Sequence, residues 1–132
     1  MGEFSYEQLF DIVRRERARE QLQELEEDFY SAAKVYQQQL EEQVREKDAL
    51  DPEADNIRTQ LVNSKKLLRE LYDRREKKIL YLALNKARTN SNLIDTSALI
   101  PQERPLFEQL EQSLKKHRQA LNLNVPAKPK KP

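Results

Sequence analysis

The chain of 132 residues contains a single glycine, Gly2, which lies at the N-terminus. No internal residue can therefore take a left-handed backbone conformation without steric cost. Asn-Gly and Asp-Gly hairpin turns and glycine bulges are absent, and runs of β-branched residues are few. The sequence therefore predicts an all-α protein and argues against a β-sheet.

The balance of apolar and charged residues predicts long helices with a thin core. Apolar residues make up 37% of the chain and charged residues 36%, which suits helices with one apolar stripe and wide solvated faces. The apolar positions are periodic, and five tyrosines and four phenylalanines are present, which argues against disorder. We expect an elongated bundle of four to five helices over residues 1–122, with one very long central helix. Residues 123–132 are rich in Pro and Lys and are expected to form a linker or a disordered tail.

Capping residues indicate where the expected helices begin. Ser5 is an N-cap candidate with Gln8 at the capping-box position, and Asp51 can cap a helix that Pro52 begins. A polar loop is expected over residues 90–100, anchored by Leu93, Ile94, Leu99 and Ile100. We expect helices over about residues 5–19, 27–49, 52–88 and 101–121.

The third expected helix is the longest, because no Pro or Gly interrupts it between Pro52 and Arg88. At about 1.5 Å per residue it would span roughly 55 Å, more than a domain of this size needs for itself. Its apolar stripe follows an eleven-residue repeat, which predicts a nearly straight or slightly right-handed path. The stripe consists of Ile57, Leu61, Leu68, Tyr72, Ile79 and Ala83.

Near the end of this helix, the six residues from Ile79 to Leu84 are apolar on every side. A helix that is apolar all round must be enclosed, and a chain of this size could enclose it only with difficulty. We therefore expect another chain to cover it, whereas Phe29, Tyr36 and Leu40 are expected in the core of this chain. The predicted subunit interface comprises Leu68, Leu71, Tyr72, Ile79, Leu80, Tyr81, Leu82 and Leu84.

The formal net charge of +1 conceals an asymmetry along the chain. Ten acidic and four basic residues lie between Arg19 and Asp51, and five acidic and ten basic residues lie between Pro52 and Arg88. The basic residues of the third helix are candidates for contact with nucleic acid or a partner. A solvated or interface face matched to acids is the favoured interpretation, because no aromatic stacking platform interleaves these bases. The candidates are Lys65, Lys66, Arg69, Arg74, Arg75, Lys77 and Lys78.

The residue types present argue against catalysis, cofactor binding and metal binding. One terminal glycine cannot supply a Walker loop or a Rossmann fingerprint. The chain has no cysteine and one histidine, too few ligands for zinc or for a Glu-x-x-His di-iron site. His117 lies at a helix-stripe position, where a partly buried or interface imidazole is expected. No apolar run approaches the roughly 18 residues of a membrane span, and the lack of cysteine fits an intracellular protein.

At the third helix the sequence resembles a known family. The stretch LLRELYDRREKKILYLALNKAR (67–88) is similar to the long helix of archaeal GINS subunits, and SALIPQERPLFEQLEQSLKKHR (97–118) resembles the segment that follows it. Near the start, SYEQLFDIVRRERA (5–18) and LEEDFYSAAKVY (25–36) resemble the opening helices of the subunit class whose helical domain comes first. The resemblance covers about residues 5–121.

The resemblance implies a scaffold function in DNA replication. GINS is a tetrameric accessory factor of the replicative helicase that bridges the MCM helicase and a Cdc45/RecJ-like protein and contacts polymerase or primase. The resemblance therefore implies other GINS subunits as partners, in a hetero- or homo-tetramer, no catalysis and a cytoplasmic, nucleoid-associated location. A basic DNA-binding module and a generic helical-bundle adaptor remain alternatives.

The sequence departs from the family pattern in two places. Members of this class carry a β-rich C-terminal domain after a flexible linker, and that domain holds much of the docking surface for the Cdc45/RecJ-like partner. This sequence ends within its Pro/Lys-rich segment. We therefore expect a fragment that lacks much of that docking surface. Gly2, Glu3 and Phe4 are interpreted as residues left by cloning. Glu26 and Glu27 stand where a proline often precedes the second helix, which affects only where that helix starts.

Overall fold

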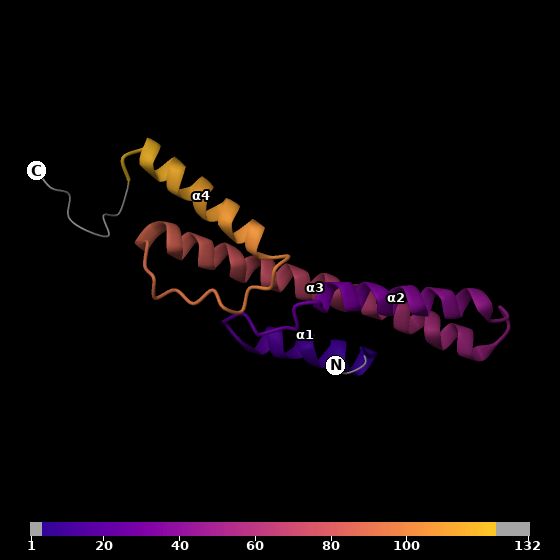
Figure 1. The fold of residues 1–132 in the computed structure, drawn as a ribbon. Helices are drawn as coiled ribbons and strands as arrows, with labels where there is room; N and C mark the ends of the chain where they lie inside the picture. The colour runs from indigo at the N-terminus through magenta and orange to yellow at the C-terminus, as the bar shows by residue number, and fades with distance from the viewer. Residues whose placement is uncertain (1–3, 124–132) are drawn as a thin grey trace, which may run out of the picture. The chain divides into compact units, whose positions relative to one another are not determined.

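The computed structural model describes residues 4–123, and within that range it contains helices and no strand. The predicted all-α fold and the single long helix are confirmed. Apart from Leu123, the expected tail over residues 123–132 lies outside the described residues. The helices, shown in Figure 1, are α1 (Tyr6–Ala18), α2 (Phe29–Glu46), α3 (Pro52–Thr89) and α4 (Arg104–Ala120).

The described chain divides into two compact units, and α3 contributes to both. Unit 1 comprises residues 4–20 and 26–74, and unit 2 comprises residues 21–25 and 75–123. Unit 1 therefore holds α1, α2 and the first part of α3. Unit 2 holds the last part of α3, the loop that follows it and α4.

The helix starts follow the capping chemistry that the sequence predicts. The backbone N–H of Gln8 donates to Ser5 Oγ at 3.1 Å and that of Ser5 donates to Gln8 Oε1 at 3.2 Å, so the capping box is complete. At the start of α3, Asp51 Oδ1 accepts from the backbone N–H of Glu53 at 2.9 Å. Helix α2 ends three residues earlier than expected, because Asp48 Oδ1 accepts from the backbone N–H of Leu50 at 3.1 Å in a competing turn.

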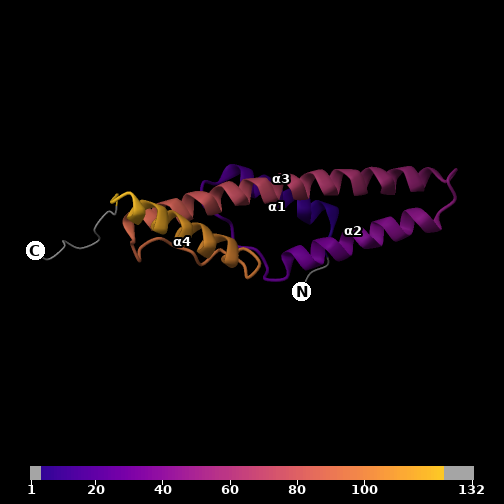
Figure 2. The same ribbon diagram turned by 90° about the horizontal axis from the view of Figure 1, so that it is seen from above.

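Unit 1 buries the facing sides of its three helices. Helices α2 and α3 form an antiparallel pair joined by the loop 47–51 (Figures 1 and 2). The predicted core residues Phe29, Tyr36 and Leu40 are all buried. The Phe4 ring lies 5.6 Å from the Phe29 ring and 5.2 Å from the Tyr36 ring, so this residue, interpreted from the sequence as left by cloning, packs on the core. The remaining buried apolar residues of the unit are Leu9, Val13, Ala33, Ala54 and Leu71.

Unit 2 builds its core from segments that are far apart in the sequence. The loop after α3 runs back along that helix, so α4 points in the same direction as the end of α3 (Figures 1 and 2). Partly buried leucines of α3 and α4 cover this core. The buried cluster consists of Leu22, Ile79, Ala83, Leu99 and Phe107.

Asparagine ends both helices of unit 2. Asn90 has φ 50° and Asn122 has φ 57°, in the left-handed region that asparagine tolerates better than other non-glycine residues. After α4, the backbone N–H of Leu123 donates to the carbonyl of Arg118 at 2.7 Å and that of Asn122 to the carbonyl of Gln119 at 3.0 Å. This pair of bonds is the Schellman arrangement, which satisfies carbonyls at the helix end.

The loop and α4 differ in part from the sequence prediction. Leu99 and Ile100 anchor the loop as expected, but Leu93 is 93% exposed and does not. His117 is exposed rather than partly buried, and Leu121 is half-exposed. His117 and Leu121 lie at the C-terminal end of α4, beyond Leu114, which packs against the buried cluster.

Candidate functional site

A buried arginine on α3 organises the polar contacts of unit 2. Arg75 is fully buried, and its guanidinium forms two bonds to Glu103: Nε donates to Oε2 at 2.6 Å and Nη2 to Oε1 at 2.8 Å. Nη1 donates to the carbonyl of Gln23 at 2.9 Å, and Nη2 also donates to the carbonyl of Ala98 at 3.1 Å. One side chain therefore ties α3 to three separate segments of the unit.

Glu103 completes this network from the start of α4. Its Oε1 also accepts from the backbone N–H of Ile100 at 3.2 Å. Its carboxylate makes no capping bond to α4, because both oxygens are used by Arg75 and the loop. The prediction that Arg75 contacts nucleic acid or a partner is wrong, since its guanidinium is enclosed and fully engaged.

Three of the other six basic candidates on α3 also have partners within this chain. Arg74 Nε donates to Glu70 Oε2 at 2.8 Å, and Lys78 Nζ donates to the carbonyl of Gln21 at 3.1 Å. Lys65 Nζ lies 3.7 Å from Glu41 Oε2. Lys66 and Lys77 are exposed. The favoured interpretation, bases matched to acids, therefore holds for Arg74 and Lys65.

Glu70 is the centre of a charged cluster in unit 1. Arg17 of α1 donates to both of its oxygens, from Nε and, at 2.8 Å, from Nη2, and Arg74 adds the third bond. The hydrogen bond from Arg17 has the largest effect on the pKa of Glu70, and that from Arg74 adds to it. Together they lower this pKa to about 2. The carboxylate therefore stays charged at all physiological pH values and links α1 to α3.

The predicted subunit-interface residues separate into buried and exposed groups. Leu71 is fully buried in unit 1 and Ile79 is 2% exposed in unit 2, so both belong to the core of this chain and cannot face a partner. The sequence prediction is wrong for these two, because both lie on the side of α3 that is buried within its own unit. Leu68, Leu82 and Leu84 are half-buried.

The exposed part of the predicted interface lies on α3 in unit 2. Leu80 is 44% exposed and Tyr81 is 67% exposed. Leu84 is four residues from Leu80 and three from Tyr81, so helical geometry places the three on one face. We call Leu80, Tyr81 and Leu84 the α3 apolar surface. Lys77 and Arg88 flank it, three and four residues away from its two ends.

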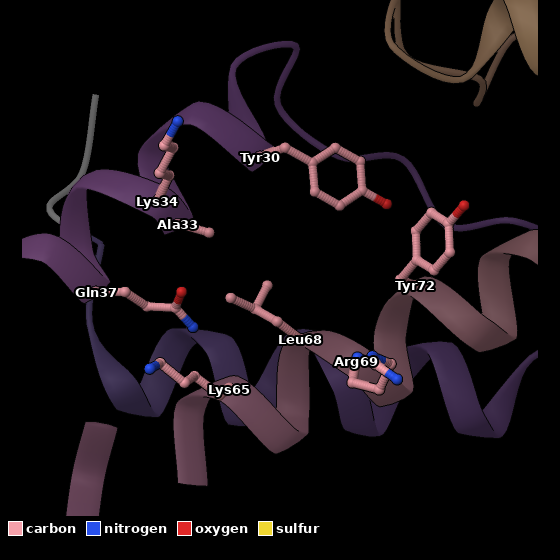
Figure 3. Close-up of a pocket in the computed structure, with 8 residues that line it drawn as sticks. All are labelled: Tyr30, Ala33, Lys34, Gln37, Lys65, Leu68, Arg69 and Tyr72. Carbon is pink, nitrogen blue, oxygen red and sulfur yellow. The ribbon is translucent and has the colours of Figure 1, made fainter. Parts of the chain in front are cut away.

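A groove lies between α2 and α3 in unit 1 (Figure 3), with a volume of about 340 Å³. Tyr30 and Tyr72 approach each other at one end, and Leu68 points into the groove from α3. Three cationic side chains, Lys34, Lys65 and Arg69, also line it. The lining residues, which we call the α2/α3 groove, are Tyr30, Ala33, Lys34, Gln37, Lys65, Leu68, Arg69 and Tyr72.

The groove shows what the sequence pattern missed. In the sequence Tyr72 is the one aromatic residue between Lys65 and Lys78, and the fold adds Tyr30 of α2 to the same groove as Lys65 and Arg69. The separation of Tyr30 from Lys65 by a whole helix and a turn hides this association from any local pattern. Tyr72, predicted as an interface anchor, is 46% exposed at this groove.

The described residues contain neither a metal-binding cluster nor a membrane-spanning helix. No group of three or more His, Cys, Asp or Glu side chains between residues 4 and 123 is placed to hold a metal ion. None of the four described helices is both long enough and apolar enough to cross a bilayer.

Comparisons with protein-family models, with curated proteins and with solved structures find no match to this chain.

Proposed function

We propose that this chain is a non-catalytic scaffold subunit of a GINS-type replication factor, which assembles with other GINS subunits through α3. The observation that carries the proposal is the α3 apolar surface, where Leu80 is 44% and Tyr81 67% exposed on a helix of 38 residues.

Burial of this surface favours association and offsets part of the roughly 4–15 kcal/mol of translational and rotational freedom that binding costs. Together Leu80 and Tyr81 offer roughly 200 Å² of side-chain surface, worth about 5 kcal/mol per subunit at about 25 cal/mol per Å². Tyrosine is also enriched at protein interfaces, where its ring packs and its hydroxyl meets the polar rim. The flanking Lys77 and Arg88 supply such a rim and favour an acidic surface on the partner.

In this role the chain supports the MCM helicase and a Cdc45/RecJ-like protein at the replication fork, in the cytoplasm at the nucleoid, and supports contact with polymerase or primase. Its own contribution is geometric: α3 presents side chains to neighbouring subunits, while the Arg75–Glu103 network fixes unit 2 behind them.

The proposal is tested by light scattering after size exclusion at micromolar concentration. The unmodified chain, alone or mixed with a second GINS subunit, is expected to form a tetramer, and the double variant Leu80→Asp/Tyr81→Asp is expected to be monomeric with unchanged helicity. Leu93→Asp is the matched control, because this leucine is 93% exposed in a loop of the same unit and its substitution should leave the assembly intact. A monomer under all conditions, or a tetramer that survives the double substitution, contradicts the proposal.

A pull-down separates a GINS subunit from a generic helical adaptor. The assembled protein is incubated with purified MCM and with a Cdc45/RecJ-like protein, and the double variant serves as the control. Retention of at least one of the two that is lost with the variant supports the replication role. Assembly without retention of either favours the generic adaptor.

A further inference from the structure

The α2/α3 groove combines positive charge with two aromatic rings, of which Tyr72 is exposed and Tyr30 half-buried. Residues 29–40 of α2 contain Lys34 and no acidic residue, and residues 56–69 of α3 contain four basic residues and no acidic residue. The residues that line the groove include three cations, Lys34, Lys65 and Arg69, and no acidic residue, although α2 as a whole belongs to the acidic part of the chain. Such a cleft attracts an anion and concentrates it locally.

The three cations of the groove differ in whether an acidic side chain of this chain lies close to them. Lys65 lies 3.7 Å from Glu41, at the edge of the acidic second half of α2. Among the described residues, no ion pair is formed by Lys34 or Arg69, and both side chains are exposed. These two side chains can therefore neutralise a ligand without first giving up an internal partner.

The rest of the lining fits a flat ring better than a docking helix. A helix bound in a groove needs a row of apolar pockets about every three or four residues, and Ala33 and Leu68 are the only aliphatic residues that line this groove. By contrast, Tyr30 and Tyr72 lie toward each other at one end, where a planar group can contact their rings (Figure 3). The volume of about 340 Å³ is at the lower end of the range for small-ligand pockets, which suits one nucleotide.

We propose that the α2/α3 groove binds single-stranded nucleic acid. One base stacks on Tyr72 beside Tyr30, and the neighbouring phosphates contact Lys34, Lys65 and Arg69. Base stacking on an aromatic side chain with backbone contacts to cations is the general mode of sequence-tolerant single-strand binding.

Binding at this groove does not require assembly through the α3 apolar surface, so the two proposals can fail separately. The test uses fluorescence anisotropy with the full chain and a labelled single-stranded oligothymidylate of about 12 nucleotides, at salt concentrations from 50 to 200 mM. Three phosphate contacts predict a slope of log K against log salt of about −2, at about −0.7 per contact for single strands. Duplex DNA of the same length is expected to bind more weakly, because its bases are not free to stack.

Three variants locate the site. Lys34→Glu is expected to weaken binding about tenfold or more and to reduce the salt slope by about 0.7. Lys66→Glu is the matched control, because Lys66 is an exposed lysine of the same unit that does not line the groove, and it should change the affinity less than threefold. Tyr72→Leu keeps apolar bulk but removes the ring, and should weaken binding about fivefold or more.

The outcomes that overturn the proposal are distinct. Absence of binding at 100 μM chain in 50 mM salt, or equal losses for Lys34→Glu and Lys66→Glu, excludes a site at the groove. Equal affinity for duplex and single strand together with no effect of Tyr72→Leu excludes base stacking. An acidic, tyrosine-containing peptide is added as a competitor. If it displaces the labelled oligonucleotide at one tenth of the concentration that unlabelled oligonucleotide requires, the groove is assigned to a protein partner instead.

Discussion

Removing the charge of Glu103 should strongly destabilise unit 2. In Glu103→Gln the side chain keeps its size, but the Arg75 guanidinium, fully buried and bonded twice to the carboxylate, loses its counter-charge. An uncompensated buried charge of this kind costs about 3–5 kcal/mol. That is a large fraction of the roughly 5–15 kcal/mol by which folded domains are stable.

Urea unfolding followed by circular dichroism measures this effect. For a denaturant dependence near 2 kcal/mol per M, the transition midpoint should fall by about 2 M. Arg74→Gln is the matched control, because the neighbouring Arg74 is 44% exposed in its pair with Glu70 and its loss should cost less than about 1 kcal/mol. The double variant Arg75→Met/Glu103→Gln should be less destabilised than the sum of the two single variants, since neither charge then remains alone.

A loss of less than about 1 kcal/mol in Glu103→Gln would refute this reasoning. So would strict additivity of the two substitutions, because it would mean that Arg75 and Glu103 do not stabilise unit 2 through each other.

Three further predictions concern unit 1. Tyr36→Phe should raise the free energy of unfolding by about 1 kcal/mol in urea titrations. The buried hydroxyl of Tyr36 has no hydrogen-bond partner among the described residues, and burial raises its pKa. A loss of stability in this variant would contradict the prediction. Pairing with Arg17 lowers the pKa of Glu70 from 4.5 to about 2. The Arg17–Glu70 ion pair should therefore contribute fully to the free energy of unfolding above pH 4.5, and this contribution should be lost as the pH falls toward 2. Solvent screening limits that contribution to about 1 kcal/mol, measurable as a smaller acid sensitivity in Glu70→Gln. Asp51→Ala should cost about 1 kcal/mol in the same titration, because Asp51 caps α3 through the N–H of Glu53; a variant as stable as the parent would show that the cap is not needed.

Helix class and helix ends could be predicted from the sequence because they depend on local chemistry. The scarcity of glycine excluded sheet turns, Ser5 and Asp51 marked helix starts, and Asn90 and Asn122 marked helix ends. Each of these effects acts within about four residues along the chain, where sequence alone determines which groups meet.

The buried face of α3 could be predicted only in part. The eleven-residue apolar repeat includes Tyr72, which is exposed, and omits Ser64 and Arg75, which are fully buried. Ser64 is satisfied inside its own helix, since its hydroxyl donates to the carbonyl of Leu61 at 2.8 Å. Arg75 is satisfied by Glu103, 28 residues away. A hydrophobic pattern assigns polar residues to the surface, so it cannot find positions where a distant partner makes burial possible.

The candidate surfaces show the same limit. The apolar segment that ends α3 was visible in the sequence, but which of its side chains remain exposed depends on how Leu22, Leu99 and Phe107 cover the rest. The α2/α3 groove depends likewise on the pairing of two helices, which brings Tyr30 beside Arg69.

The central claim is that another chain covers the part of α3 that its own fold leaves open. Hydroxyl-radical footprinting with mass spectrometry, at concentrations below and above assembly, measures this at individual side chains. We expect modification of Leu80 and Tyr81 to fall several-fold on assembly, while Leu93 stays equally reactive. Unchanged reactivity of Leu80 and Tyr81 in an assembled sample would contradict the claim.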